Sequence, residues 1–273
     1  MIISNLTGGL GNQMFQYAFG RYQAIKNGTK LKLHFTNALF NTQYTYELGV
    51  FKIKADIATH EDLKKVNVLG NRIINRVLYL CDERFGIQLN RHIITQKYPY
   101  KFDSNYLNIK DNSYIQGFWS DERYFKTIEN ILRSEFTLKK ELDEKNRQIL
   151  GEIEKSNSIS IHVRRGDYVT HKSNAKNIGF VGLEYYETAI KEIKKSISHP
   201  LFFVFSNDIV WCRENLAPLS KNMHFISHNS GRNSYKDLIL MSSCKHNIIA
   251  NSTFSWWGAW LNTNKNKLRI SPS

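Results

Sequence analysis

Two adjacent arginines, Arg164 and Arg165, follow the apolar segment 159–163 in a cluster that also contains His162 and Asp167. A guanidinium group presents a planar fork of N–H donors that fits the paired oxygens of a phosphate. Two arginines side by side at the end of a strand are costly unless an anion meets them. The sequence therefore predicts a phosphate-bearing ligand at the carboxyl edge of a parallel sheet.

The two arginines are expected to have different roles, because successive side chains of a strand point to opposite faces. One would bind the phosphate, and the other would support the turn by pairing with Asp167 or another carboxylate. His162 would point to the sheet face opposite Ile161 and Val163. An exposed turn with a surface salt bridge is the alternative interpretation.

A glycine-rich turn, residues 8–13, is the second candidate site, between an expected strand at 2–6 and a helix that ends near residue 27. Glycines at such a turn let backbone N–H groups approach a pyrophosphate. The turn has no Gly-Lys-Ser/Thr of a nucleotide-binding P-loop, and Met14 stands where a dinucleotide fingerprint has its third glycine. A tight turn without a ligand is therefore the alternative. The residues chosen here are Gly9, Gly11, Asn12 and Gln13.

An acidic residue, Asp208, follows the expected strand at 201–205. Ligands of α/β proteins are recognised at such strand ends, where a carboxylate could accept hydrogen bonds from the N1–H and N2 amine of a guanine. Capping of the next helix is the alternative, and both roles can coexist.

A serine-rich helix start is the fourth candidate site, after an expected buried strand at 247–250. The free N–H groups of a first helical turn and the helix dipole together favour an anion. Three tryptophans in this helix are expected to pack in the core rather than contact a ligand. The site residues chosen here are Asn251, Ser252, Thr253 and Ser255.

Strands and helices alternate along both halves of the chain, which predicts an α/β fold with parallel sheets. The first half would end near residue 150, and the charged helix expected at 138–154 would link it to the second half at 151–273. Further strands are expected at 31–35 and 113–119. Further helices are expected at 121–136, 184–196, 235–242 and 253–261.

Charge and composition limit the possible functions. The 273 residues carry a net charge of +14, which favours an anionic partner such as a nucleotide, a membrane surface or a nucleic acid. A lack of basic stripes on helices weighs against nucleic acid. Three widely spaced cysteines and the lack of a signal peptide favour a reduced, cytoplasmic protein, and any membrane contact is expected to be peripheral. The acidic residues and histidines form no pattern that indicates a metal site.

The four sites together resemble the motif set of the bacterial α-1,2-fucosyltransferases of glycosyltransferase family 11. The matching segments run in order along nearly the whole chain and comprise residues 8–18, 162–168, 205–208 and 251–257. The resemblance implies a GT-B-like fold, with two Rossmann-like domains whose parallel sheets face a central cleft. It places the acceptor in the first domain and GDP-fucose in the second.

The resemblance also implies an activity, namely transfer of L-fucose from GDP-β-L-fucose to the 2-hydroxyl of a terminal β-galactoside. The transfer would invert the anomeric centre, with no metal and no cofactor. The acceptor would be a galactoside-terminated glycan, as in O-antigen biosynthesis, and any membrane contact would be at the cytoplasmic face of the inner membrane. Phe118 and Trp119 are candidates for the acceptor groove, with a core role as the alternative.

Individual residues receive roles from the same resemblance. Arg164 would bind the β-phosphate, His162 and Asp208 would contact the guanosine, and Asp167 would be a base or a partner of Arg165. The glycine loop and the serine-rich helix start would add N–H and hydroxyl donors. A different sugar nucleotide or linkage on the same fold, or a non-enzymatic protein that binds anions, are the competing interpretations.

Overall fold

The computed structural model describes residues 1–35, 45–66, 92–165 and 181–272. Contacts divide the chain into two units, Met1–Lys139 and Lys140–Ser273. The boundary lies before the expected position at residue 150, because helix α5 (Glu144–Lys155) packs within the second unit, against α10. Asp143 caps this helix by accepting a hydrogen bond from the backbone N–H of Asn146.

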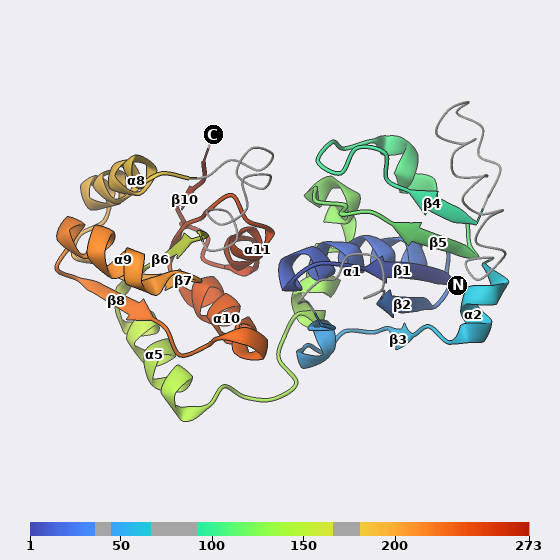
Figure 1. Ribbon diagram of the computed structural model, residues 1–273, viewed down its shortest axis with the longest axis horizontal. Coiled ribbons are helices and arrows are strands. Elements are labelled where there is room, and N and C mark those ends of the chain that lie inside the picture. Colours follow the sequence, from blue (N-terminus) through green and yellow to red (C-terminus); the bar gives the residue numbers. More distant parts are fainter. Residues whose placement is uncertain (36–44, 67–91, 166–180, 273) are drawn as a thin grey trace. The chain divides into compact units, whose positions relative to one another are not determined.

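The N-terminal unit contains a five-stranded sheet in the order β3-β2-β1-β5-β4, and all of its strand pairs are parallel. Figure 1 shows α1 beside β1 and β5. The strands are β1 (Ile2–Leu6), β2 (Leu31–Phe35), β3 (Asp56–Ile57), β4 (Ile93–Thr95) and β5 (Ser113–Gln116). The helices are α1 (Leu10–Lys26), α2 (His60–Lys65) and α4 (Glu129–Glu135), and short 3₁₀ turns are η1 (Leu48–Val50), η2 (Ser104–Asn108), η3 (Glu122–Tyr124) and η4 (Lys126–Ile128).

Helix α1 packs very closely on the sheet. A Cβ atom at Gly20 would lie 2.9 Å from the side chains of Ser4 and Leu31, so no larger residue fits there without a shift. Ser4 donates a hydrogen bond from its hydroxyl to the carbonyl of Gln16 at 2.9 Å. Ile3 and Tyr114 point to the opposite face and pack with Leu63 of α2. The sheet is therefore buried on both faces, as parallel sheets are.

The C-terminal unit repeats this plan with the order β10-β9-β6-β7-β8, again with parallel strand pairs. Its strands are β6 (Asn157–Val163), β7 (Pro200–Ser206), β8 (Met223–Ile226), β9 (His246–Ile248) and β10 (Arg269–Ile270). Its helices are α5, α8 (Leu183–Ser196), α9 (Ile209–Leu216), α10 (Tyr235–Ser243) and α11 (Thr253–Leu261), with 3₁₀ turns η5 (Ala217–Leu219) and η6 (Gly231–Asn233). The predicted α/β class with two parallel sheets is confirmed, whereas the central cleft stays a prediction.

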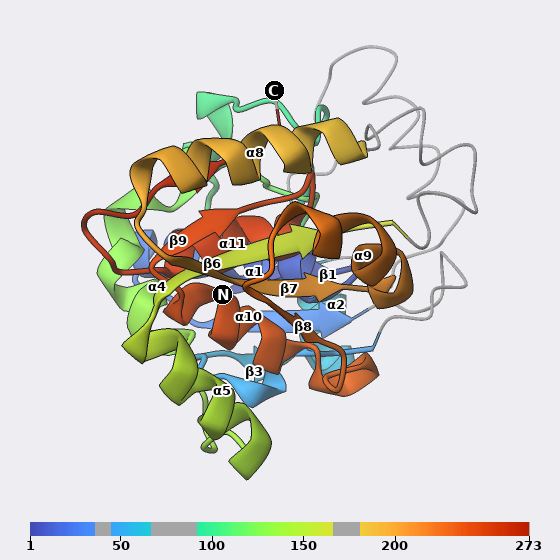
Figure 2. The same ribbon diagram turned by 90° about the vertical axis from the view of Figure 1, so that its left-hand side faces the viewer.

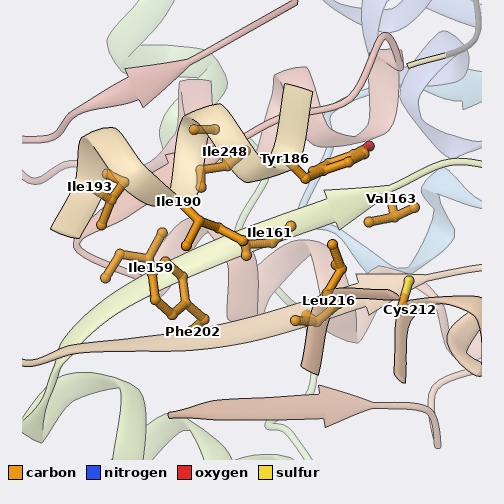
Figure 3. Close-up of a cluster of buried hydrophobic side chains, with 12 residues drawn as sticks. Ile159, Ile161, Val163, Tyr186, Ile190, Ile193, Phe202, Cys212, Leu216 and Ile248 are labelled. Carbon is orange, nitrogen blue, oxygen red and sulfur yellow. The ribbon is translucent and has the colours of Figure 1, made fainter. Parts of the chain in front are cut away.

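Figure 2 shows α8 over one face of this sheet and α10 on the other. The core beneath α8 and α9 contains the alternate residues Ile159, Ile161 and Val163 of β6, packed against Ile190 and Leu216 (Figure 3). This alternation leaves Ser160 and His162 of β6 on the opposite face, where α10 and α11 pack.

Both sheets reverse their strand order at the first strand of their unit. Strand β1 lies between β2 and β5, and strand β6 lies between β7 and β9. In open α/β sheets, ligands bind outside the carboxyl ends of the strands at such a reversal. A ligand site is therefore expected among the residues that follow β1, β5, β6 and β9.

Candidate functional site

The C-terminal reversal brings three of the predicted sites together. Strand β6 ends at Val163 and leads into Arg164 and Arg165. Its neighbour β7 ends at Ser206, paired in register with Val163, and leads into Asp208. Its other neighbour, β9, is paired so that Ile161 lies beside Ile248, and leads into the start of α11. Sequence-distant residues thus meet at one edge because all three strands run in the same direction.

His162 is buried at this edge, with a side chain whose Nδ1 has no hydrogen-bond partner among the described residues. Its ring centroid lies 5.6 Å from that of Phe254 on α11. Burial, helped by the positive charge of Arg164, lowers the pKa of His162 to about 3. The imidazole is therefore neutral at physiological pH and can donate or accept a hydrogen bond without adding charge.

Arg165 is the supporting member of the arginine pair, as the sequence predicts for one of the two. Its guanidinium lies 4.1 Å from the centre of the Trp211 ring, and its Nε lies 3.4 Å from Oδ2 of Asp208. Its backbone N–H donates to Asn207 Oδ1 at 3.0 Å. Its carboxylate partner in the described residues is thus Asp208, and Asp167 lies outside them. Arg164, which follows β6 directly and is half-buried, is left as the candidate phosphate ligand.

Asp208 is the N-cap of α9, which confirms the alternative interpretation of this residue. Its Oδ1 accepts a hydrogen bond from the backbone N–H of Trp211 at 3.2 Å, while Oδ2 faces Arg165. Its own N–H donates to the hydroxyl of Ser206. The carboxylate is half-exposed, so the additional contact with a guanine stays a prediction.

The serine-rich segment forms a capped helix start at the carboxyl end of β9. Ser252 is the N-cap of α11, and its hydroxyl accepts from the N–H of Phe254 at 3.3 Å. Ser255 is buried, and its hydroxyl donates to the carbonyls of Ala250 and Ser252 at 3.4 Å, so it orders the turn from inside. Asn251 and Thr253 lie at the more accessible side of this turn.

The tryptophans of α11 pack as predicted. Trp257 is fully buried, Trp260 is nearly so, and Trp256 stacks on Trp260 with ring centroids 6.3 Å apart. A Cβ atom at Gly258 would lie 3.1 Å from Cβ of Met241, which shows how closely α10 and α11 approach. These rings hold the helix whose first turn faces the predicted phosphate.

The glycine loop occupies the corresponding edge of the N-terminal unit. Gly8 has a φ of +73°, which favours glycine, and Gly9 is the N-cap of α1 without a side-chain cap. A Cβ at Gly8 would lie 2.7 Å from Nδ2 of Asn12, so the amide of Asn12 packs over the loop. Gly11 is buried in the first turn. A helix start without a side-chain cap suits an anion or a polar ligand group.

Gln13 is fully buried and holds the loop in place. Its Nε2 donates to the carbonyls of Gly8 at 2.9 Å and Thr45 at 2.8 Å, and its Oε1 accepts from the backbone N–H of Glu47 at 2.9 Å. The structure thus gives Gln13 a positioning role, and its predicted contact with the donor stays a prediction.

Gln16 is a second buried amide that the sequence analysis did not single out. It accepts from the N–H of Thr7 at 2.9 Å and donates to the carbonyl of Gly117 at 3.0 Å. It therefore ties the ends of β1 and β5 together at the reversal. Its place three residues after Gln13 on the same helix is the signal that could have identified it.

Aromatic residues follow β5, as expected, but they divide between core and surface. Trp119 is fully buried and stacks on Phe19 at 4.1 Å, so its proposed place in an acceptor groove is wrong. Phe118 is half-buried, and its ring lies nearly parallel to that of Tyr100, with centroids 6.4 Å apart and an angle of 8°. Tyr100 is 70% exposed. This pair forms an aromatic surface at the carboxyl edge.

Several other features concern the possible chemistry. In the ranges that the structure covers, His, Cys, Asp and Glu side chains form no group of three that could hold a metal ion. Cys212 and Cys244 are buried free thiols, and Cys81 lies outside the described residues. No helix of the described ranges has the length and apolar character that a bilayer span requires.

Comparisons with known proteins agree on a family. Residues 84–271 match the model described as glycosyl transferase family 11. The chain is 33% identical over its whole length to an alpha-1,2-colitosyltransferase of Escherichia coli, covering 91% of that protein. It is 32% identical over 98% of its length to the O-antigen biosynthesis glycosyltransferase WbnK of Escherichia coli, covering 93% of it. A galactoside alpha-(1,2)-fucosyltransferase 1 of Plecturocebus brunneus is 30% identical over 54% of this chain and 42% of its own.

Solved structures with a similar fold include two proteins crystallized with GDP or GDP-fucose. The alpha-1,6-fucosyltransferase NodZ co-crystallized with GDP matches 94% of this chain and 91% of its own, with a TM-score of 0.57 and 15% identity. POFUT1 in complex with GDP-fucose matches 99% of this chain and 96% of its own, with a TM-score of 0.51 and 12% identity. At these identities the likeness concerns the fold, and it confirms the predicted GT-B-like class. Taken with the family match over most of the chain, it leads to one conclusion: this chain belongs to glycosyl transferase family 11 and is a glycosyltransferase.

Proposed function

We propose that this protein transfers L-fucose from GDP-β-L-fucose to the 2-hydroxyl of a terminal β-galactoside. The C-terminal unit binds the donor, the N-terminal unit binds the acceptor, and the anomeric centre is inverted. The names of the relatives support the 1,2 linkage, since colitosyl and fucosyl transferases with that linkage both match. Two proteins of similar fold, NodZ and POFUT1, were crystallized with GDP and GDP-fucose, respectively, which supports a guanine nucleotide as the carrier.

The observation that carries the proposal is the placement of fixed donors at the β6–β9 reversal. Arg164 follows β6, and the capped first turn of α11 follows β9 on the adjacent strand. A departing GDP needs its new negative charge stabilised, and an arginine with helix N–H groups can do this without a metal ion. Fucosyl transfer proceeds through an oxocarbenium-like transition state, so stabilisation of the leaving group is a large part of catalysis.

Arg165 and Asp208 support this arrangement rather than share it. Asp208 faces Arg165 and caps α9, which fixes the course of the chain on both sides of the β6 and β7 ends. Arg164, which follows β6 directly, is the cation proposed to bind the phosphate. His162, kept neutral by burial, is proposed to hydrogen-bond the nucleotide through the Nδ1 atom that lacks a partner within the described ranges.

The acceptor is proposed to lie on the aromatic surface of the N-terminal unit. Sugars present flat apolar C–H faces, and an aromatic ring offers a large surface with a wet edge. Tyr100 and Phe118 lie parallel at the carboxyl edge of β4 and β5, and Tyr100 is mostly exposed. This position is near the glycine loop, because Gln16 binds both Thr7, which directly precedes the loop, and Gly117.

A nucleotide titration tests the donor class. Calorimetry with GDP, UDP, ADP and CDP should show binding of GDP alone at micromolar concentration, and preference for another base would refute the guanine assignment. Transfer assays with GDP-fucose and terminal β-galactosides should then give a product whose linkage and anomeric configuration are read by NMR. Failure to modify any galactoside would refute the acceptor class.

A colitosyl donor is the second candidate, because the relative that is 33% identical over the whole chain is named as a colitosyltransferase. The same assay with GDP-colitose decides between them. A specificity constant greater for GDP-colitose than for GDP-fucose would replace fucose in the proposal and leave the rest unchanged.

A further inference from the structure

Glu47 lies beside the glycine loop, on the turn that leads into η1. The buried amide of Gln13 binds the carbonyl of Gly8 on one side and the N–H of Glu47 on the other, each at 2.9 Å. The same amide donates to the carbonyl of Thr45. The backbone of Glu47 is therefore one side chain away from the loop that follows β1.

The turn that carries Glu47 is anchored on its other side as well. Leu48 and Phe51 are fully buried, and Phe51 forms a β-bridge with Leu138. Lys139 donates from its ammonium group to the carbonyl of Gly49 at 3.0 Å. Because both ends of the turn are fixed, the backbone of Glu47 has a defined place beside the glycine loop.

The carboxyl itself is half-buried, and no hydrogen bond to it is found in the described ranges. Burial raises the pKa of Glu47 to about 6. Helix α1 packs against this turn, and two of its polar side chains, like Lys139, have partners of their own. Arg21 and Tyr17 of α1 both bond to Glu135, and Lys139 bonds to Gly49.

Other carboxylates of the same sheet have fixed structural partners. Hydrogen bonds from Lys32 and Thr59 lower the pKa of Asp62. For Asp121, burial alone would raise the pKa, but hydrogen bonds from Arg123 outweigh it and lower the value. Asp103 accepts from the N–H of Asn105. Glu47 differs in being partly desolvated without such a partner, which is how general bases are prepared.

We propose that Glu47 is the general base that activates the hydroxyl of the acceptor. This inference rests on the proposed function. As the acceptor oxygen forms its bond to C1 of the sugar, its proton passes to the Glu47 carboxylate. The bond between C1 and the β-phosphate oxygen breaks at the same time, and its electron pair leaves with GDP. The protonated carboxyl then returns its proton to water.

Replacement of Glu47 by Gln tests the proposal, since it keeps the shape of the side chain and removes the base. Turnover of the Glu47→Gln variant should fall by about 10²- to 10⁴-fold, the usual contribution of a general base. The KM for the donor and the affinity for GDP should stay near wild-type values. Glu122→Gln is the matched control, because Glu122 is an exposed glutamate that follows β5 in the same unit, and its turnover should be unchanged.

The pH profile supplies a readout that a structural role would not change. Wild-type kcat should fall as the pH drops below about 6, where the base becomes protonated, and Glu47→Gln should lack this limb. Glu47→Asp retains a carboxylate and should retain an acidic limb with reduced turnover, which decides the case if the Gln variant does not fold.

Two failures can be told apart. A wild-type protein that transfers no fucose-like sugar would refute the proposed function. A wild-type protein that does transfer it, together with a Glu47→Gln variant of equal turnover and the same acidic limb, would refute only the assignment of Glu47.

Discussion

The two units share one plan and differ in the chemistry of their carboxyl edges. Each has a parallel sheet whose order reverses at the first strand, and each has a helix start at that reversal. The C-terminal edge presents Arg164 beside a neutral, buried histidine. The N-terminal edge presents a half-buried carboxyl, Glu47, and an aromatic pair. The same scaffold thus carries a cationic site in one unit and a weakly acidic, apolar one in the other.

The two edges are therefore suited to different parts of a transfer reaction. A fixed cation suits a group that gains negative charge as it leaves, and a carboxyl of raised pKa suits a group that must lose a proton. The N-terminal edge also carries an arginine, and that arginine is paired within its own unit. Arg123, which follows β5, is bonded to Asp121 and lies over the ring of Phe102, so its charge is already balanced.

Exchange of the two arginines for alanine is expected to give the largest contrast. Arg164→Ala should lower turnover by at least about 100-fold, the scale of losing one group that stabilises a developing anion. Arg123→Ala is the control at the other edge and should leave turnover near the wild-type value. Steady-state kinetics of both variants measure the two losses, and equal losses would refute a special role for Arg164.

Removal of the aromatic surface is expected to affect the acceptor alone. Tyr100→Ala should raise the KM for the acceptor by up to about tenfold, since a stacked ring contributes about 0.5–1.5 kcal/mol. Tyr98→Ala is the matched control, because Tyr98 is also exposed, at 57%, but does not stack on Phe118. A change in the KM for the donor instead would show that this surface binds the donor and would refute its assignment to the acceptor.

His162 should make the protein sensitive to acid. Its pKa is lowered by burial in the folded state, so the unfolded chain binds the proton more readily as the pH falls below 6.5. The contribution of the neutral, buried His162 to the free energy of unfolding is complete above pH 6.5 and is lost as the pH falls towards about 3. Over this range the free energy of unfolding should decrease by up to about 1.4 kcal/mol per pH unit. Denaturant unfolding of His162→Gln should show a flatter pH dependence, whereas His60→Gln, at an exposed position, should resemble the wild type.

Chelation is expected to have the smallest effect, namely none. If fixed groups at the β6–β9 reversal balance the charge of the leaving GDP, turnover measured with EDTA should equal turnover without it. Restoration of lost activity by Mg²⁺ or Mn²⁺ would show that a metal takes over part of the role given to Arg164.

The regular elements were predictable because hydrophobic periodicity determined them. The bounds of β1 and β2 match the expected strands, and the continuous apolar run from Leu201 identified β7. The expected helix at 121–136 is wrong in extent, because Asp121 caps a 3₁₀ turn and Phe125 leaves helical geometry before α4 begins. The expected helix at 184–196 matches α8, which buries Tyr186, Ile190 and Ile193.

Site residues that belong to a contiguous sequence motif were predictable. Residues that reach the site only through long-range contacts were not. Periodicity and spacing could place Arg164 and Ser252 at strand ends, but they could not show that Arg165 turns to Asp208. The roles of Gln16 and Glu47 depend on contacts over 101 and 34 residues of sequence, respectively. Short strands such as β3 and β8 were missed because so few residues give a weak pattern.

The amide of Gln13 has a practical consequence for protein engineering. It makes three bonds, to residues 8, 45 and 47, with no exposure to solvent. A graft of the glycine motif into another scaffold would leave these buried groups without hydrogen-bond partners, as would a chimera with a crossover between residues 13 and 45. Each unpaired group would lower the free energy of unfolding by about 1–3 kcal/mol. Segments 8–13 and 45–47 should therefore be moved as one cassette.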